Sequence, residues 1–170
     1  MDYTYIKDAT DARATPVLTA VDVRTSSTYW RQADYKGRLD TEVMRGMARW
    51  LLEIGRTGPL RVRSDPEPSI LSLVQELARI RGSNVTVVEC SPVASKGSLG
   101  SCERAHQSLV GLLRTLKAAT QERHKAHIPV KSTIMAWLVQ HVAWVYNHCQ
   151  PVNGTTPYES IMLKPYAGEL

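Results

Sequence analysis

The stretch Val17-Leu18-Thr19-Ala20-Val21-Asp22-Val23 decides the fold, because its β-branched and apolar residues predict a strand around which a sheet can be placed. Further strands are predicted before it, over residues 2–6, and after it, over residues 27–33. The polar residues 7–16 and the turn at residues 24–26 connect them. Three strands with short connections indicate an antiparallel meander.

Beyond residue 38 the apolar residues recur at helical spacing. Helices and strands are predicted to alternate, in the order helix 39–54, strand 60–64, helix 70–81, strand 85–90, and then helices over about 101–120 and 134–148 and after Pro157. This order is the one found in the ribonuclease-H-like fold. We therefore expect an α/β protein of that fold. Its five-stranded mixed sheet would hold three antiparallel strands and two strands reached through right-handed crossovers, flanked by helices.

Two late helices carry apolar stripes that we expect to face the core. In the helix over about 101–120 the predicted buried residues are His106, Leu109, Val110, Leu113 and Leu116. In the helix after Pro129 they are Ile134, Trp137, Leu138, His141, Val145 and His148. Core packing is the first interpretation of Trp137 and Trp144, which lie seven positions apart, and a dimer interface is the alternative.

The composition fits one globular domain. The chain has 170 residues, of which 43% are hydrophobic, and this share is enough to bury a core. It has no run of about 18 apolar residues and no basic or apolar leader, so we expect neither a membrane span nor secretion. The three cysteines, Cys90, Cys102 and Cys149, form no CxxC pair, which argues against a disulfide framework or a cysteine-built zinc site and favours an intracellular, reducing compartment.

The positive charge is concentrated in one segment. The chain has 21 basic and 16 acidic residues, a net charge of +5. Residues 91–131 contain seven basic residues against Glu103 and Glu122, so this segment carries the whole excess. Charge alone leaves two interpretations open, a solvated basic face and a face that binds a polyanion.

Three carboxylates are candidates for a metal site. Asp2 lies on the first predicted strand, Asp65 at the end of the fourth, and Glu103 at the start of the third helix. A crossover that places the fourth strand beside the first brings Asp2 and Asp65 to one sheet edge, and the helix can deliver Glu103 to them. Clustered carboxylates repel one another unless a cation lies between them. Hard oxygen ligands suit Mg²⁺ or Mn²⁺, and two such ions are a common device for phosphodiester chemistry.

Six motifs in order make the chain resemble the catalytic core of retroviral and retrotransposon integrases. These are Met1-Asp2-Tyr3, Val17-Leu18-Thr19-Ala20-Val21-Asp22, Arg63-Ser64-Asp65-Pro66-Glu67-Pro68-Ser69-Ile70, the segment from Ser91-Pro92 to Gly100-Ser101-Cys102-Glu103-Arg104-Ala105, Trp144-Val145-Tyr146-Asn147 with Arg114-Thr115-Leu116 before it, and Thr156-Pro157-Tyr158-Glu159. Each motif is weak by itself, and their shared order along essentially the whole chain is specific.

The resemblance implies a metal-binding Asp-Asp-Glu triad formed by Asp2, Asp65 and Glu103, with two Mg²⁺ or Mn²⁺ ions. It also implies cleavage at the DNA ends of an element and transfer of the freed 3′-hydroxyls to target DNA. DNA would then be the partner, in a homodimer or higher oligomer acting in the nucleus. The residues expected to contact DNA are Lys96, Arg104, Gln107, Arg114 and Lys117.

Several positions depart from the family pattern. Pro66 and Glu67 replace an Asp-x-Gly sequence, and Glu67 is interpreted as an acid at a helix N-terminus. Leu99 stands where a DNA-positioning Gln or Asn is common, and Gln107 stands where a lysine is frequent. Asp22, also on a strand, is the alternative to Asp2 as the first metal ligand.

Other functions stay open from the sequence. One is a catalytically inactive, integrase-derived module for DNA binding or dimerisation, and another is a nuclease on the same fold. We expect residues 1–170 to be a catalytic core without the family's zinc module and C-terminal DNA-binding domain, with Met1 internal to a longer polyprotein. The pair His124 and His127 lacks the cysteine half of a zinc site, and a polar helix end is its preferred interpretation.

Overall fold

The computed structural model describes residues 1–7, 14–38, 40–82, 85–90 and 100–168. The predicted meander is confirmed: β1 (Asp2–Ile6), β2 (Thr15–Val21) and β3 (Thr28–Gln32) form an antiparallel sheet in that order. The register places Thr19 of β2 between Asp2 of β1 and Trp30 of β3. β2 is therefore the central strand, and its Val17 and Leu18 are fully buried on opposite faces.

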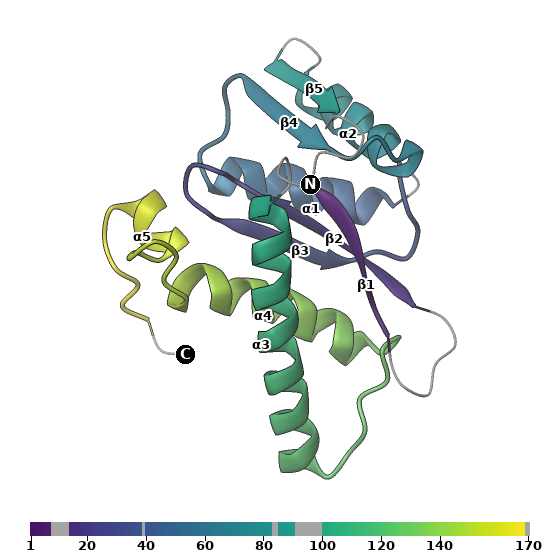
Figure 1. Cartoon of the computed structure of the whole chain (residues 1–170), viewed down its shortest axis with the longest axis vertical. Coiled ribbons are helices and arrows are strands. Elements are labelled where there is room, and N and C mark those ends of the chain that lie inside the picture. Colours follow the sequence, from purple (N-terminus) through teal and green to yellow (C-terminus); the bar gives the residue numbers. More distant parts are fainter. Residues whose placement is uncertain (8–13, 39, 83–84, 91–99, 169–170) are drawn as a thin grey trace.

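The two later strands form a separate sheet. β4 (Leu60–Ser64) and β5 (Thr86–Cys90) pair in parallel, and α2 (Pro68–Arg81) connects them. The expected single five-stranded mixed sheet is therefore not what the described residues form. Met1, which directly precedes β1, donates through its α-ammonium a hydrogen bond of 2.9 Å to the carbonyl of Arg63 in β4. One such bond brings the two sheets side by side and does not make a ladder (Figure 1).

Helices cover both faces of the meander, as predicted (Figure 1). α1 (Thr41–Glu53) and α2 share one core with Leu18 and Ala20 of β2. α3 (Gly100–His124) and α4 (Thr133–Cys149) share a second core with Val17 and Trp30. The short helix α5 (Pro157–Met162) lies against α4. Among the described helices, none is long and apolar enough to cross a membrane.

The first two helices follow their sequence signals. Asp40 caps α1 by accepting a hydrogen bond of 3.0 Å from the Val43 amide, and Met47 and Trp50 are buried as the apolar stripe predicts. α2 ends at Gly82, whose φ of 100° is a conformation that side chains other than glycine's rarely allow. These caps and stripes place both helices against the same face of the sheet.

The stripe predicted for α4 is wrong in part. Ile134 and Trp137 are 56% and 57% exposed, and His141, Val145 and His148 are half-buried. The buried face consists instead of Met135, Leu138, Val139, Val142, Ala143 and Tyr146. Trp137, His141, Trp144 and His148 stack in a row along the other side of the helix. Apolar residues surround most of α4, so their spacing alone could not select the packed face.

α3 is longer than predicted, and its predicted buried stripe is confirmed only at Leu109 and Leu113. It runs to His124, and its buried side chains are Cys102, Ala105, Leu109 and Leu113. The predicted His106, Val110 and Leu116 are half-buried. Figure 1 shows α3 beginning beside the N-terminus and extending past the sheet, so only its first half packs closely against β2.

Asn147 of α4 joins this helix to the edge of the meander. Its amide group donates to the Thr28 carbonyl and accepts from the Thr28 amide, both at 2.8 Å. The side chain therefore satisfies both polar backbone groups of an edge residue, as another strand would. This pairing gives a structural reason for the asparagine in the Trp144–Asn147 motif.

Candidate active site

Asp2 lies on β1 directly opposite Thr19, and it is half-buried. Burial raises the pKa of its carboxyl group, and the negative charge of Asp65 raises it further. A hydrogen bond from the Tyr3 amide and the charge of the Met1 α-ammonium act in the opposite direction without cancelling the effect. The charge of Asp65 thus contributes to the raised pKa of Asp2.

Asp65 is the first residue after β4. The hydrogen bond from Met1 to Arg63 joins the start of β1 to this end of β4, two residues before Asp65. The turn that follows leads into α2, where Glu67 occupies the N-cap position. The Glu67 carboxylate does not cap the helix: it accepts from the Lys36 ammonium and the Ser69 hydroxyl, and the Lys36 ammonium lowers its pKa.

Glu103 lies in the first turn of α3 and is exposed. It shares a small cavity of about 170 Å³ with Asp2, and the other lining residues are Thr4, Thr19, Cys102, His106 and Gln107. The buried thiol of Cys102 holds the helix start here, 3.5 Å from the carbonyl oxygen of Thr19. Because Thr19 is the register partner of Asp2, this contact brings Glu103 to the Asp2 side of the sheet.

The pKa of the Cys102 thiol responds to the charged groups of the site. Burial raises the pKa of its thiol, and the negative charges of Asp2 and Asp65 add to this, while the Met1 α-ammonium lowers it. Both aspartates thus act on the residue next to Glu103. His106, one turn further along α3, packs edge-on against Trp30 with ring centres 6.3 Å apart, and burial lowers its pKa.

The donor set suits a hard divalent cation, because it consists of carboxylate oxygens whose mutual repulsion a cation relieves. Asp2 and Glu103 line one cavity, and the charge of Asp65 contributes to the raised pKa of Asp2. Within the described ranges, however, no group of three acidic, histidine or cysteine side chains is close enough to hold a metal ion. The carboxylate oxygens therefore suit a divalent cation chemically, but the three side chains do not form one cluster.

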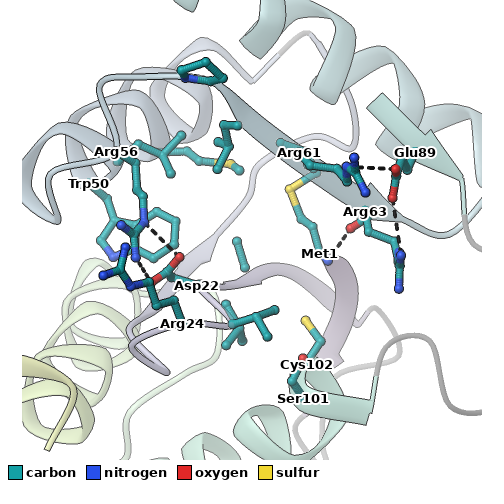
Figure 2. A pocket seen from close by; sticks show the side chains of 18 residues that line it. Met1, Asp22, Arg24, Trp50, Arg56, Arg61, Arg63, Glu89, Ser101 and Cys102 are labelled. Atoms are coloured by element: carbon teal, nitrogen blue, oxygen red, sulfur yellow. Dashed lines mark hydrogen bonds and ion pairs between the residues drawn. The ribbon is translucent and has the colours of Figure 1, made fainter. Parts of the chain in front are cut away.

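Asp22, the alternative first ligand, has another partner. The Arg56 guanidinium donates to both of its carboxylate oxygens at 3.0 and 2.6 Å, and Thr25 donates through its amide and hydroxyl groups. Burial raises the pKa of Asp22, and these hydrogen bonds lower it by more, so that the net pKa is depressed. Figure 2 shows this ion pair facing away from Asp2's neighbour Met1. Asp22 thus serves as an ion-pair partner at the end of β2.

The residues expected to contact DNA lie mostly along α3. Gln107 and Arg114 are exposed and lie within about 40° of Glu103 around the helix axis, as does the half-buried Lys117. Arg104 is exposed about 100° away from Glu103. Lys96 and Leu99 lie outside the described residues.

Sequence reasoning missed two residues that shape this site. The sequence motifs contain both Cys102 and Thr19, but neither residue was predicted to position the site. A signal for Cys102 was present, because it precedes Ala105 by three residues and Leu109 by seven and so continues their buried face. The cavity position of His106 had no such signal, because its spacing also suits the core.

Comparison with known structures shows the class of fold. The chain is 18% identical to a chain of the simian T-cell lymphotropic virus intasome, solved with PP2A regulatory subunit B56 gamma; the match covers 99% of this chain at a TM-score of 0.71. The present chain therefore spans only 55% of the length of that viral chain. The catalytic core of HTLV-2 integrase in complex with magnesium (trimeric form) is 17% identical over 94% of this chain and 92% of that one, with a TM-score of 0.67.

The catalytic core of BIV integrase is 16% identical, with a TM-score of 0.60 over 96% of this chain and 91% of that one. No protein-family model and no curated protein matches the sequence. The chain therefore has the fold of a retroviral integrase catalytic core. This finding confirms the resemblance read from the six motifs, and the assignment of individual residues still depends on the site itself.

Proposed function

We propose that the chain is the catalytic core of an integrase-type polynucleotidyl transferase, which cleaves element DNA ends and joins them to target DNA. The observation that carries the proposal is that Asp2 and Glu103 line one cavity in an integrase-core fold. The charge of Asp65 also contributes to the raised pKa of Asp2. The order of the strands, the start of α3 beside β2 and the similarity of the fold to integrase cores support this assignment.

Asp2, Asp65 and Glu103 would hold Mg²⁺ or Mn²⁺, and the presence of magnesium in the similar HTLV-2 core supports this choice. Such ions activate an attacking oxygen and stabilise a leaving one at a phosphodiester. The chain's own residues position the donors. The Cys102–Thr19 contact fixes the start of α3, and the Met1–Arg63 bond fixes β1 against β4.

DNA would lie along α3. Glu103, Gln107 and Arg114 share one face of this helix, and Arg114 lies about 16 Å from Glu103 along the axis. A phosphate backbone on this face would pass from the carboxylates to the basic residues, which gives affinity with little sequence choice. Dimeric and trimeric forms of the HTLV-2 core support the proposal of a homodimer or higher oligomer. The polyprotein origin and nuclear action stay predictions.

The test is a strand-transfer assay with Mn²⁺ and oligonucleotides that carry the element's ends. Glu103→Gln removes the carboxylate charge and keeps the shape, so the proposal expects loss of at least 100-fold in product. Glu122→Gln is the matched control, because Glu122 is exposed near the far end of the same helix. Activity that survives Glu103→Gln would refute the triad.

A catalytically inactive DNA-binding or dimerisation module is the second candidate. It is favoured by one observation, namely that no group of three acidic, histidine or cysteine side chains within the described ranges is close enough to hold a metal ion. The two functions separate in calorimetry with Mg²⁺ or Mn²⁺ in the presence of DNA. An enzyme core binds the ion through Glu103, whereas the module binds DNA equally well without any divalent ion.

A further inference from the structure

Lys36 and Glu67 form an ion pair between the two parts of the chain that carry Asp2 and Asp65. The Lys36 ammonium donates to Oε1 of Glu67 at 2.5 Å, and the Ser69 hydroxyl donates to the same oxygen at 2.6 Å. Lys36 lies between β3 and α1, whereas Glu67 lies between β4 and α2. Because Asp2 belongs to the three-stranded sheet and Asp65 follows a strand of the other sheet, contacts between the two sheets set the separation of these aspartates.

The Lys36 end of this pair is held on β1. Its ammonium lies 5.2 Å from the centre of the Tyr3 ring and 5.1 Å from the centre of the Tyr5 ring, within the range of a cation–π interaction. The next residue, Gly37, donates through its amide to the Tyr3 hydroxyl at 3.1 Å. Tyr3 is buried and directly follows Asp2, so Lys36 is anchored beside the first candidate metal ligand.

Gly37 brings the same segment close to the start of α2. Its φ of 87° lies in the region that favours glycine, and a Cβ atom there would lie 2.8 Å from the Ser72 hydroxyl oxygen and 3.2 Å from the Ser69 carbonyl oxygen. A side chain at this position would therefore be strained. Glycine lets the backbone after Lys36 pack against the first turns of α2, where the ion pair with Glu67 forms.

Two prolines stiffen the connection between Glu67 and Asp65. Pro66 and Pro68 have fixed φ angles, and a proline also drives the residue before it toward extended conformations. Glu67 is extended accordingly, with φ of −67° and ψ of 126°. Holding the Glu67 side chain therefore also holds Asp65, two residues earlier in the chain.

Asp65 is thus linked to the β1 side of the molecule both before and after it in the sequence. Two residues before it, the Arg63 carbonyl accepts the hydrogen bond of 2.9 Å from Met1. Two residues after it, Glu67 accepts from Lys36. Figure 1 shows the start of β1 beside the end of β4, where the first of these links lies.

We infer that Lys36 is a positioning residue of the metal site: its ion pair with Glu67 holds the turn that carries Asp65 against β1 and so sets the separation of Asp65 from Asp2. The inference rests on the proposed function, in which both aspartates bind the ion. It also gives a role to Pro66 and Glu67, which depart from the family pattern.

The surroundings of the pair suit this role. Exposed ion pairs usually contribute little, because water screens the charges and the side chains lose freedom. The Lys36 and Glu67 side chains are only 27% and 39% exposed, and two aromatic rings and the Ser69 hydroxyl fix their geometry. The pair is therefore able to hold one segment in place against another.

Charge alone predicts the opposite effect of Lys36 on metal binding. Burial raises the pKa of Asp2, and the negative charges of Asp65 and Glu67 add to this, so the charge of Glu67 acts at the site. Removing the Lys36 ammonium would leave that negative charge uncompensated and would by itself strengthen the binding of a divalent cation. If Lys36 positions Asp65, its removal weakens binding instead.

The experiment is a double-substitution cycle on Lys36 and Glu67. Lys36→Gln, Glu67→Gln and the variant with both changes are titrated with Mn²⁺ alone, followed by the EPR signal of the free ion, beside the unmodified chain. Lys36→Arg tests rescue by another cation, and Arg79→Gln breaks an ion pair elsewhere on α2 as the control. In the metal-free proteins, ¹⁵N order parameters of the amides at positions 65 and 67 measure how firmly the turn is held.

Each single Gln substitution should weaken Mn²⁺ binding about tenfold, the effect typical of groups that orient metal ligands, and the double variant should bind no more weakly than either. Lys36→Arg should retain most of the affinity and Arg79→Gln all of it. In all three Gln variants of the cycle, the order parameters at positions 65 and 67 should fall from about 0.85 toward 0.6.

Tighter Mn²⁺ binding by Lys36→Gln, with the double variant equal to the unmodified chain, would show a charge effect and overturn the inference. A lower Tm with unchanged Mn²⁺ affinity and unchanged order parameters would show a purely structural ion pair and overturn it as well. The proposed metal site fails separately, if Glu103→Gln leaves Mn²⁺ binding unchanged. The link to the turn then stands if the order parameters fall in Lys36→Gln, and it fails if they do not.

Discussion

The thiol of Cys102 lies 3.5 Å from the carbonyl oxygen of Thr19, and this contact fixes the position of the glutamate that follows it in the chain. Thr19 is at the centre of the meander and pairs with Asp2 on one side and Trp30 on the other. A contact between two buried residues thus sets the separation of the exposed Glu103 from Asp2. The geometry of the carboxylates depends on packing beneath them.

A larger residue at position 102 should therefore damage the site. Cys102→Leu overpacks a position that is 4% exposed, which costs about 1–3 kcal/mol in the free energy of unfolding and moves the start of α3 away from β2. We expect strand transfer to fall more than tenfold. Cys102→Ala should keep most activity, because the helix can stay in place, and Cys149→Leu controls for added bulk elsewhere. Full activity of Cys102→Leu would contradict the positioning role.

The ion pair of Asp22 and Arg56 should make stability depend on pH. The folded-state pKa of Asp22 lies below its ordinary value of 3.8, so the ionised form stabilises the fold. This contribution is present above about pH 4 and is lost as the pH falls through the depressed folded-state pKa. Asp22→Asn should cost about 1.5–3 kcal/mol at pH 7, because charged hydrogen bonds are lost.

Urea unfolding of both proteins from pH 7 to pH 2 measures this difference. The gap between them should be constant near neutral pH and shrink as acid protonates Asp22. An equal gap at every pH would show that the ion pair is not its source. If Asp22 were instead a metal ligand, the substitution would also abolish Mn²⁺ binding, which we do not expect.

Asn147 should matter for stability and not for chemistry. Asn147→Asp removes the donor to the Thr28 carbonyl and places a negative charge beside it, so we expect a loss of about 1–3 kcal/mol. Gln140→Glu on the exposed side of α4 makes the same change of group and should be nearly neutral. Thermal unfolding at fixed pH compares the two, and equal Tm changes would contradict the strand-edge role.

The basic face of α3 should make DNA binding sensitive to salt. If four to six phosphates are neutralised, log K should fall with log salt at a slope of roughly −4 to −5. Arg114→Gln should reduce the steepness by about one. Arg79→Gln is the control, because Arg79 is exposed on α2 and paired with Glu76. A slope near zero for the unmodified chain would reject the polyanion face.

Local signals predicted much of this fold. The alternating strands around Thr19, the Asp40 cap of α1 and the Gly82 stop of α2 each follow from local chemistry that the sequence displays. They also place Asp2 on the first strand and Asp65 directly after the fourth. The order of elements therefore predicted a ribonuclease-H-like fold, and the six motifs predicted the integrase catalytic core among proteins of that fold.

Features that depend on long-range packing could not be predicted. α4 is apolar on several sides, so the exposure of Trp137 follows from which face the sheet occupies. The strands form two sheets, and a single hydrogen bond from Met1 to Arg63 joins the start of β1 to β4. No local sequence pattern predicts this arrangement. The roles of Cys102 and His106 likewise arise from contacts between residues far apart in the sequence.

The most direct test of the account is a titration with paramagnetic Mn²⁺, followed through the amide NMR signals of the protein bound to DNA ends. The account predicts that signals around Asp2, Asp65 and Glu103 broaden together at the same low Mn²⁺ concentration, and that Glu103→Gln weakens this effect while Glu122→Gln does not. Broadening around Glu122 instead, or identical titrations of the two variants, would contradict the claim that these three carboxylates form one metal-binding active site.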